Sequence, residues 1–409
     1  MRILMLAQFY APVVGGEERM TEAYSQGLAA RGHEVRVATL EHPDRPTVMR
    51  QGDVAVHSLP SLTGRLPGLH SESDRHHAPP FADPLTVRAL GALLTEFDPD
   101  VVHAHNWIDH AYLPLARRSR AAYVLHLHDG SLVCATKRLI WQGGPCPGPE
   151  PHRCRVCAAG HYGRISGPAI ATLVRRSSVR RRRAADLLLP ISEYIAEVSG
   201  LTGGPDPYEV LPNFAPDPVA DPAAGTLALP DEPFLMAAGD QSNDKGAGVL
   251  LDAYSRLTGA PPLVLLGRNI DIDPAQLPPG VRALGPVAHD EVLAAWRRAL
   301  IAIVPSVLPE AFGLVALEAM QAGRPVVASR SGGLAEVVDE RSGVLVEPGD
   351  AGALADALGA LLADPRRIEQ LGSGAATRAG EFSAAVILPR LEAAYARAID
   401  RHTARRGAA

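Results

Sequence analysis

Short apolar runs alternate with helix-length segments along almost the whole of this chain of 409 residues. In the first half, runs with the length and composition of buried strands lie at 3–6, 35–39, 54–59, 101–105, 123–128 and 187–192. Strands that alternate with helical patterns are typical of βαβ units, in which each helix crosses back over a parallel sheet. The alternation therefore predicts an α/β fold with a doubly wound parallel sheet.

The pattern stops at a proline-rich stretch and then begins again. Residues 214–232 show little periodicity, which indicates a linker. Beyond it, strand-like runs recur at 234–239, 262–267, 281–285, 301–306, 326–329 and 344–347. We expect two Rossmann-like domains, at 1–213 and 233–381, and a final helix within 382–409 that packs back on the first domain. Ligands of open parallel sheets bind beyond the carboxyl ends of the strands, so the cleft between the two domains is the expected site.

Charge and hydropathy limit the partners and the compartment. The net charge of −5 argues against a general nucleic-acid binder. The first residues hold one arginine and a short apolar run, and then meet proline, glycine and two acids, which makes a poor signal peptide. No run approaches the ~18 apolar residues that span a bilayer. We expect a cytoplasmic protein, or one peripheral to the inner face of the membrane.

Two carboxylates in the second half bracket a predicted helix start. Glu310 follows the strand-like run at 301–306, and Glu318 lies beyond seven intervening residues, AFGLVAL. A helix from about Gly313 to Ala322 would leave the amides of its first turn without partners within the helix. Carboxylates accept hydrogen bonds from vicinal hydroxyls, and free amides suit a diphosphate. The alternative is two solvated acids beside an amphipathic helix.

A Gly-Gly turn follows the first predicted strand. Gly15 and Gly16 carry no side chain, so a ligand can approach their amides closely, and a helix begins just after them. The positive end of that helix dipole suits phosphate. A tight strand-to-helix turn with no ligand explains the same residues.

These segments together resemble the retaining glycosyltransferases of family four, which have the GT-B fold of two Rossmann-like domains facing a central cleft. The resemblance covers residue 2 to about 400 and is most specific at 310–349. Its other parts are the Gly-Gly turn, DKG at 244–246, and the pieces RGHEVRV (31–37), PDVVHAHN (99–106), LHDG (127–130), ADLLLPIS (185–192) and VLPNF (210–214).

The resemblance implies roles for particular residues of the donor site. Glu310 would contact the donor sugar near the reacting carbon, and Glu318 would bind the ribose of the nucleotide. The amides of Phe312, Gly313 and Leu314, together with Gly16, would cradle the diphosphate and the sugar. The chain has only two lysines, Lys137 and Lys245, and Lys245 matches the family lysine that neutralises the leaving diphosphate. A solvated loop lysine is the alternative.

His128 and Asp129 end the run at 123–128. The resemblance places His128 near the donor sugar, and Asp129 would orient the histidine or receive the acceptor proton. A core histidine bonded to backbone is the alternative for His128.

One position departs from the family pattern. Where the family has an arginine that binds the diphosphate, this chain has Asp240, within AAGDQSNDKG. An acid at that position repels a diphosphate unless it is turned away or protonated. We hypothesise that Arg268, after the run at 262–267, supplies the missing positive charge; the alternative is an ordinary exposed arginine.

Four cysteines fall in one stretch that is rich in proline and glycine. Cys134, Cys146, Cys154 and Cys157 are separated by eleven, seven and two residues, within an insertion at about 130–162. The Cys154–Cys157 spacing suits tetrahedral thiolate ligation, so a structural zinc is one interpretation. Disulfides and free thiols are the others.

Six arginines lie between Arg175 and Arg183. They suit a peripheral contact with anionic lipid or a phosphorylated acceptor, and a solvated helix face is the alternative.

The sequence as a whole predicts a glycosyltransferase that moves a sugar from a nucleoside diphosphate sugar to an acceptor hydroxyl with retention. The acceptor would be a polysaccharide, a glycolipid or a secondary metabolite. We expect no metal in catalysis, because no acid pair suited to a metal-bound diphosphate is evident. A nucleotide-sugar epimerase or hydrolase of the same fold is the alternative.

Overall fold

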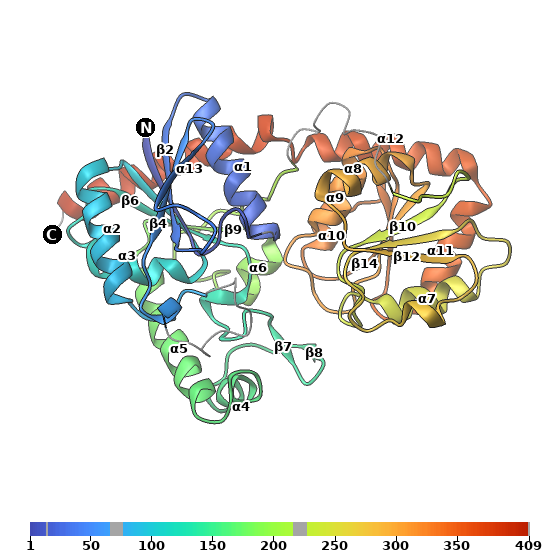
Figure 1. Cartoon of the computed structure of the whole chain (residues 1–409), viewed down its shortest axis with the longest axis horizontal. Helices are drawn as coiled ribbons and strands as arrows, with labels where there is room; N and C mark the ends of the chain where they lie inside the picture. The colour runs from blue at the N-terminus through green and yellow to red at the C-terminus, as the bar shows by residue number, and fades with distance from the viewer. Residues whose placement is uncertain (14, 66–76, 216–226, 408–409) are drawn as a thin grey trace. The chain divides into compact units, whose positions relative to one another are not determined.

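The computed structural model describes residues 1–13, 15–65, 77–215 and 227–407. It divides into two compact units, Met1–Pro212 with Ile387–Ala409, and Asn213–Val386. Most of the predicted linker, 216–226, lies outside the described residues. Each unit is an α/β sheet flanked by helices, which confirms the predicted fold class (Figure 1).

The first unit is built on a seven-stranded sheet in the order β3-β4-β2-β1-β5-β6-β9. Its strands are β1 (Arg2–Ala7), β2 (Glu34–Leu40), β3 (Val48–Gln51), β4 (Val54–Leu59), β5 (Val101–His105), β6 (Ala122–Leu127) and β9 (Leu187–Pro190). The pairs are parallel, apart from the antiparallel β3–β4 pair at one edge. Helices cover both faces, so strand residues such as Ile3 and Leu4 are fully buried.

The helices of this unit connect consecutive strands. They are α1 (Gly16–Ala30), α2 (Pro84–Phe97), α3 (Asp109–Ala116), α4 (Pro151–Tyr162), α5 (Ser166–Ala184) and α6 (Glu193–Val198), with short 3-10 turns at Thr63–Arg65, Asn106–Ile108 and Gly130–Leu132. The start of α2 shows the local cause: the carboxylate of Asp83 accepts from the amides of Leu85 and Thr86, and Pro84 takes the first helical position. The insertion after β6 forms a small hairpin, β7 (Ile140–Trp141) with β8 (Gly144–Pro145), followed by α4.

The second unit is built on a six-stranded parallel sheet in the order β12-β11-β10-β13-β14-β15. Its strands are β10 (Leu235–Ala238), β11 (Leu263–Leu266), β12 (Val281–Gly285), β13 (Ile301–Val304), β14 (Val326–Ser329) and β15 (Gly343–Val346). Its helices are α7 (Ala247–Ser255), α8 (His289–Arg298), α9 (Leu314–Gln321), α10 (Leu334–Val337), α11 (Ala351–Leu362) and α12 (Pro365–Gly380), with a 3-10 turn at Pro274–Gln276.

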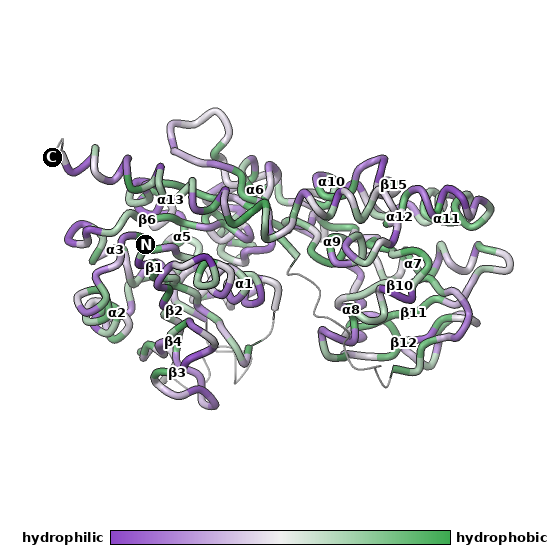
Figure 2. Tube along the Cα trace, turned by 90° about the horizontal axis from the view of Figure 1, so that it is seen from above, coloured by the Kyte–Doolittle hydropathy of each residue, from purple (hydrophilic) through white to green (hydrophobic). Residues whose placement is uncertain are grey.

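The last helix, α13 (Ala384–Gly407), leaves the second unit and packs on the first. Its Tyr395 is fully buried, and its Glu392 accepts hydrogen bonds from Arg31 at 2.7 and 2.8 Å. Figure 2 shows hydrophilic residues toward its C-terminal end, whereas α7 is mostly hydrophobic. Among the described residues, no helix is long and apolar enough to cross a membrane.

Candidate functional site

In the second unit, the structure brings Lys245 and Glu310 together. Lys245 follows β10 and Glu310 follows β13, which is the neighbouring strand in the sheet. The ammonium group of Lys245 donates to Oε1 of Glu310 at 2.6 Å, and the hydroxyl of Ser306 donates to the same oxygen at 2.5 Å. Because the carboxyl ends of parallel strands meet at one edge of a sheet, two predicted site residues that are 65 positions apart share one hydrogen bond.

Two glycines allow this close approach. Gly246 has φ +79°, and a Cβ there would lie 1.9 Å from the carbonyl oxygen of Pro305. Gly332 has φ +56°, and its Cβ would lie 2.3 Å from the carbonyl oxygen of Glu310, which accepts from the amide of Gly333 at 2.8 Å. Any side chain at these positions would push the loops that carry Lys245 and Glu310 apart. Sequence reasoning missed Ser306 and Gly332.

The helix predicted after Glu310 is α9, which begins at Leu314 with Gly313 as its N-cap. The amides of its first turn have no partner within the helix, as the diphosphate prediction for Phe312, Gly313 and Leu314 requires. The side chain of Phe312 is buried and packs edge-on against Phe382 at 5.8 Å. It therefore anchors the turn from which those amides project.

Glu318 lies in the second turn of α9 and is 9% exposed. Its Oε1 lies 3.5 Å from Nε2 of His289, the first residue of α8. His289 was not predicted as a site residue. Its imidazole is a polar neighbour, on α8, of the Glu318 carboxylate that we predict to bind the ribose.

The departure at Asp240 has a structural answer. The guanidinium of Arg268 binds this carboxylate through two hydrogen bonds, Nε to Oδ1 at 2.9 Å and Nη2 to Oδ2 at 2.7 Å. Arg268 offsets the charge of Asp240, and it offers correspondingly less charge to a ligand. The role of Arg268 in donor binding stays a prediction.

In the first unit, α1 begins at Gly16 with Gly15 as its extended N-cap. Glu17 and Glu18 occupy the first turn. A Cβ at Gly15 would meet the carboxyl group of Glu18, so this acid lies beside the turn and competes with any anion bound at Gly16. The turn at Gly15 and Gly16 is therefore less attractive to the predicted diphosphate than a turn without a neighbouring acid would be.

A polar cluster, formed by Glu17, Asn106, Asp129 and Lys137, connects the ends of β1, β5 and β6. The amide nitrogen of Asn106 donates to Oε2 of Glu17 at 2.9 Å and to Oδ2 of Asp129 at 3.3 Å. The amide oxygen accepts from the ammonium of Lys137 at 2.6 Å. The same ammonium lies 4.4 Å from the centroid of the Trp107 ring, a cation–π contact. Lys137, which had no role from sequence, thus joins the predicted Asp129 at the carboxyl edge of the sheet.

The polar cluster shifts the acidity of its members. Burial first, and the Asp129 carboxylate second, raise the pKa of Glu17 to about 8. Burial lowers the pKa of Lys137, while Asp129 and Glu17 oppose that shift. A carboxyl with a pKa near neutrality can either donate a proton or accept one, so Glu17 is suited to contact a substrate hydroxyl.

His128 follows β6 and pairs with a second histidine. Its Nε2 lies 2.8 Å from Nδ1 of His105, and burial lowers the pKa of His128 to about 4. The imidazole is therefore neutral at pH 7. Its Nδ1 has no hydrogen-bond partner among the residues that the structure describes. His105 fixes the ring and leaves this nitrogen available.

Two further histidines belong to the core. Nδ1 of His103 lies 2.8 Å from the hydroxyl of Tyr395, and its Nε2 lies 3.1 Å from Nδ1 of His126. Ring nitrogens of His103, His105 and His126 lie within 4.8 Å of one another, a spacing that a metal ion accepts. Because these contacts already use both nitrogens of His103 and one each of His105 and His126, we assign the group to packing of α13 on the sheet.

No disulfide joins the four cysteines, all of which lie among the described residues. Burial raises the pKa of Cys154 and of Cys157, and in each case the nearby Cys134 and Cys146 add to the rise. In the part of the chain that the structure describes, no three of the sulfur atoms lie within 4.8 Å of one another. The zinc site stays a prediction.

The basic run is not one solvated face. Arg181 is fully buried; its Nε donates to Oδ2 of Asp109 at 2.6 Å, and its other nitrogens donate to the carbonyls of Ser131 and Asn106. Arg182 pairs with Asp206 at 2.7 Å. Neither is available to a partner, and Arg181 holds the turns that carry Asn106 and Ser131.

Comparison with known proteins supports one family along most of the chain. A family described as "Glycosyl transferases group 1" matches residues 232–364, and a "Glycosyl transferase 4-like domain" matches residues 15–213. A protein of Xylanimonas cellulosilytica named D-inositol 3-phosphate glycosyltransferase is 30% identical, over 99% of this chain and 98% of that protein.

Solved structures share the fold. A sucrose-phosphate synthase from Thermosynechococcus elongatus superposes with a TM-score of 0.73 at 22% identity, over 97% of this chain and 98% of that one. The Anabaena protein HepE, solved in complex with UDP and glucose, gives a TM-score of 0.69 at 21% identity, over 97% and 99% of the two chains. At these identities the likeness shows the GT-B fold alone.

Proposed function

The chain belongs to the glycosyl transferases group 1 family, and on that premise we propose that it moves a sugar from a nucleoside diphosphate sugar to an acceptor hydroxyl with retention of anomeric configuration. The observation that carries the proposal is the 2.6 Å contact between Lys245 and Glu310 at the carboxyl ends of β10 and β13. It holds a cation and a carboxylate within reach of one ligand, at the edge where α/β sheets bind theirs.

Lys245 and Glu310 have complementary tasks in this reaction. The bond between the anomeric carbon and the diphosphate breaks, and the leaving group gains negative charge that the Lys245 ammonium stabilises. Glu310 accepts hydrogen bonds from hydroxyls of the sugar and keeps the reacting carbon in place. The amides at the start of α9 bind the diphosphate, and Glu318 binds the ribose.

Retention follows from a displacement on one face of the sugar. The acceptor oxygen bonds to the anomeric carbon on the side that the diphosphate leaves, and the acceptor proton passes to the departing phosphate oxygen. Lys245 supplies the charge neutralisation in this scheme, so the reaction needs no metal.

On the acceptor side, the polar cluster around Asn106 would bind the incoming hydroxyl. Glu17 and Asp129 would accept its hydrogen bond or donate to it, and Lys137 would hold Asn106 in place. The neutral His128 would face the donor sugar with its Nδ1.

The structural neighbour HepE was solved with UDP and glucose, so a uridine nucleotide is the first donor to test. The acceptor is a polysaccharide, a glycolipid or a secondary metabolite, and peripheral contact with the inner membrane face runs through the exposed arginines between Arg175 and Arg183. Localisation in the cytoplasm is part of the same proposal.

A thermal-shift screen of nucleoside diphosphates and their sugars tests the donor, and product analysis with candidate acceptors tests the transfer. We expect one nucleotide to raise the melting temperature, the product to keep the donor's anomeric configuration, and a chelator to leave the rate unchanged. Product formed without any acceptor would instead indicate an epimerase or hydrolase of this fold.

A further inference from the structure

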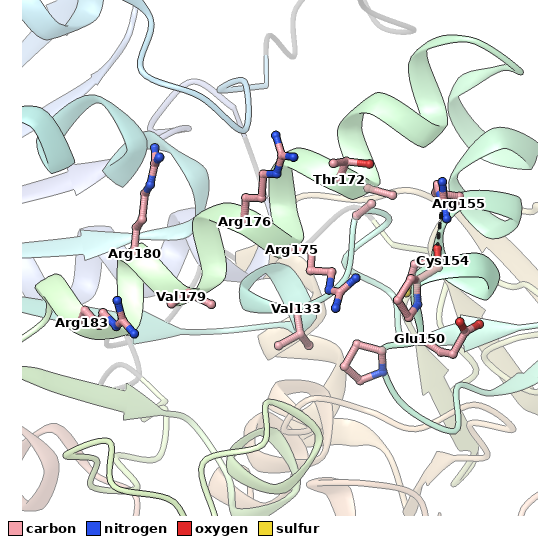
Figure 3. Close-up of a pocket in the computed structure, with 14 residues that line it drawn as sticks. Val133, Glu150, Cys154, Arg155, Thr172, Arg175, Arg176, Val179, Arg180 and Arg183 are labelled. Atoms are coloured by element: carbon pink, nitrogen blue, oxygen red, sulfur yellow. Dashed lines mark hydrogen bonds between the residues drawn. The ribbon is translucent and has the colours of Figure 1, made fainter.

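A basic hollow of about 700 Å³ lies beside α5 in the first unit, and Cys154, one of the predicted zinc ligands, is among the residues that line it. Its walls are α5, the start of α4 and the loop that contains Val133 and Ala135 (Figure 3). The helices α4 and α5 lie side by side (Figure 1). The hollow is thus built by the cysteine insertion together with the helix of the basic run.

Four arginines of α5 face this hollow. Arg175, Arg176, Arg180 and Arg183 line it and are exposed, and their spacing of one, four and three residues places them along one side of the helix. Among the described residues, none of the four guanidinium groups has a hydrogen bond or an ion pair, in contrast to the buried Arg181. Their charges are therefore available to a ligand.

The hollow has little negative charge of its own. Its lining holds five arginines, Arg155 included, and one acid, Glu150. The Glu150 carboxylate caps α4 by accepting from the amides of His152 and Arg153 at 2.8 and 2.6 Å, and these bonds lower its pKa. A bound anion would meet a strong excess of positive charge, and guanidinium groups bind phosphate through paired hydrogen bonds.

Exposed apolar side chains lie on the same two helices or at the turn between them, and Val179 lies among the arginines of the hollow. Ile165, between α4 and α5, is 91% exposed; Val179 lines the hollow and is 49% exposed. Val156 on α4 and Leu173 on α5 are also exposed. Among the described residues, no aromatic side chain lines the hollow, which offers a nucleobase no stacking surface there. Basic and apolar groups on one helical surface are typical of proteins that bind at a lipid interface.

We propose that this hollow binds the phosphate group of an anionic lipid, with Val179 against the adjoining hydrocarbon. This proposal rests on the membrane contact in the proposed function, and it specifies the pocket that makes the contact and the lipid phosphate that binds there. The residues that bind the lipid phosphate are Arg175, Arg176, Arg180 and Arg183. Arg181 and Arg182 take no part.

The test is co-sedimentation of the full chain with vesicles of phosphatidylglycerol in phosphatidylcholine, and with phosphatidylcholine alone. The pocket variant is Arg176→Gln with Arg180→Gln. The matched control is Arg117→Gln with Arg118→Gln, which removes two exposed charges from the same unit. At ~1 kcal/mol per charge near an anionic surface, the pocket variant should bind about 30-fold more weakly, and the control should bind like the wild type.

Two further arms separate a lipid from a soluble anion. Val179→Ser should also weaken vesicle binding. Inorganic pyrophosphate should compete with the vesicles for the wild type, but it should bind the protein less tightly than the lipid does. The proposal is wrong if the wild type does not bind vesicles that contain phosphatidylglycerol, if both arginine pairs weaken binding equally, or if Val179→Ser has no effect. The rise in melting temperature that a nucleoside diphosphate causes, measured on the same variants, reports on the donor site. If the nucleotide stabilises the variants and the vesicles do not bind, the lipid proposal fails and the proposed function stands.

Discussion

Replacing Arg181 by methionine should destabilise the first unit severely, although Arg181 stands in a run of exposed arginines. Both Arg181 and its partner Asp109 are fully buried. Burial alone would raise the pKa of Asp109, but the Arg181 guanidinium lowers it to about 2. Without Arg181 the buried carboxylate would keep only the Tyr123 hydroxyl at 2.8 Å and the His110 imidazole at 3.3 Å, and the carbonyls of Ser131 and Asn106 would lose a donor. Breaking a buried ion pair in this way costs about 3–5 kcal/mol.

Urea unfolding followed by circular dichroism measures the fall in the free energy of unfolding, and thermal unfolding gives the matching fall in melting temperature. In a unit of this size, each kcal/mol corresponds to about 2–4 °C in melting temperature, so a fall of roughly 6–20 °C is expected. Arg180→Met is the matched control and should change the free energy of unfolding by less than about 0.5 kcal/mol. If the two variants lose equal stability, or if Arg181→Met costs under about 1 kcal/mol, the structural role of Arg181 is refuted.

Three other results would test separate parts of the account. Asp240→Asn removes an acid near the predicted diphosphate and frees the Arg268 guanidinium. Calorimetry should therefore show several-fold tighter binding of a nucleoside diphosphate. Unchanged affinity would mean that Asp240 and Arg268 lie away from the bound donor. Glu17 has a pKa raised from 4.5 to about 8, so the folded state holds a proton that the unfolded state loses first, and the wild type loses stability as pH rises between these values. Glu17→Gln should therefore melt higher than the wild type at about pH 9 but not at about pH 4, and an equal difference at both values would contradict the shift. Reduced protein should contain about one zinc per chain, lost in Cys154→Ser, if the cysteines form the predicted tetrahedral site; metal-free wild type would end that hypothesis.

Apolar runs predicted the central strands well because those strands are buried on both faces and need no alternation. The strands that the sequence did not indicate are β3, β7 and β8. β3 lies at the sheet edge, with residues that are only partly buried or exposed, and β7 and β8 are two residues each. These three strands depend on the geometry of the turns beside them, and their residues form no hydrophobic pattern from which they could be predicted.

The site divides in a similar way. Glu310 and Lys245 could be predicted because a local motif surrounds each. Lys137 could not, because its contact with Asn106 arises only when the insertion folds back across the end of β5. Arg181 could not be distinguished from its neighbours either, since its buried partner Asp109 lies 72 residues away.

The central claim is that Lys245 and Glu310 act on one donor, and the turnover of Lys245→Ala and Glu310→Gln tests it most directly. Rates with the stabilising nucleotide sugar should fall about 10²–10⁴-fold in each variant, by the scale of lost transition-state contacts. Arg256→Ala, which removes an exposed cation of the same unit that pairs with Asp252, should keep the wild-type rate. Wild-type turnover in either site variant would contradict the account.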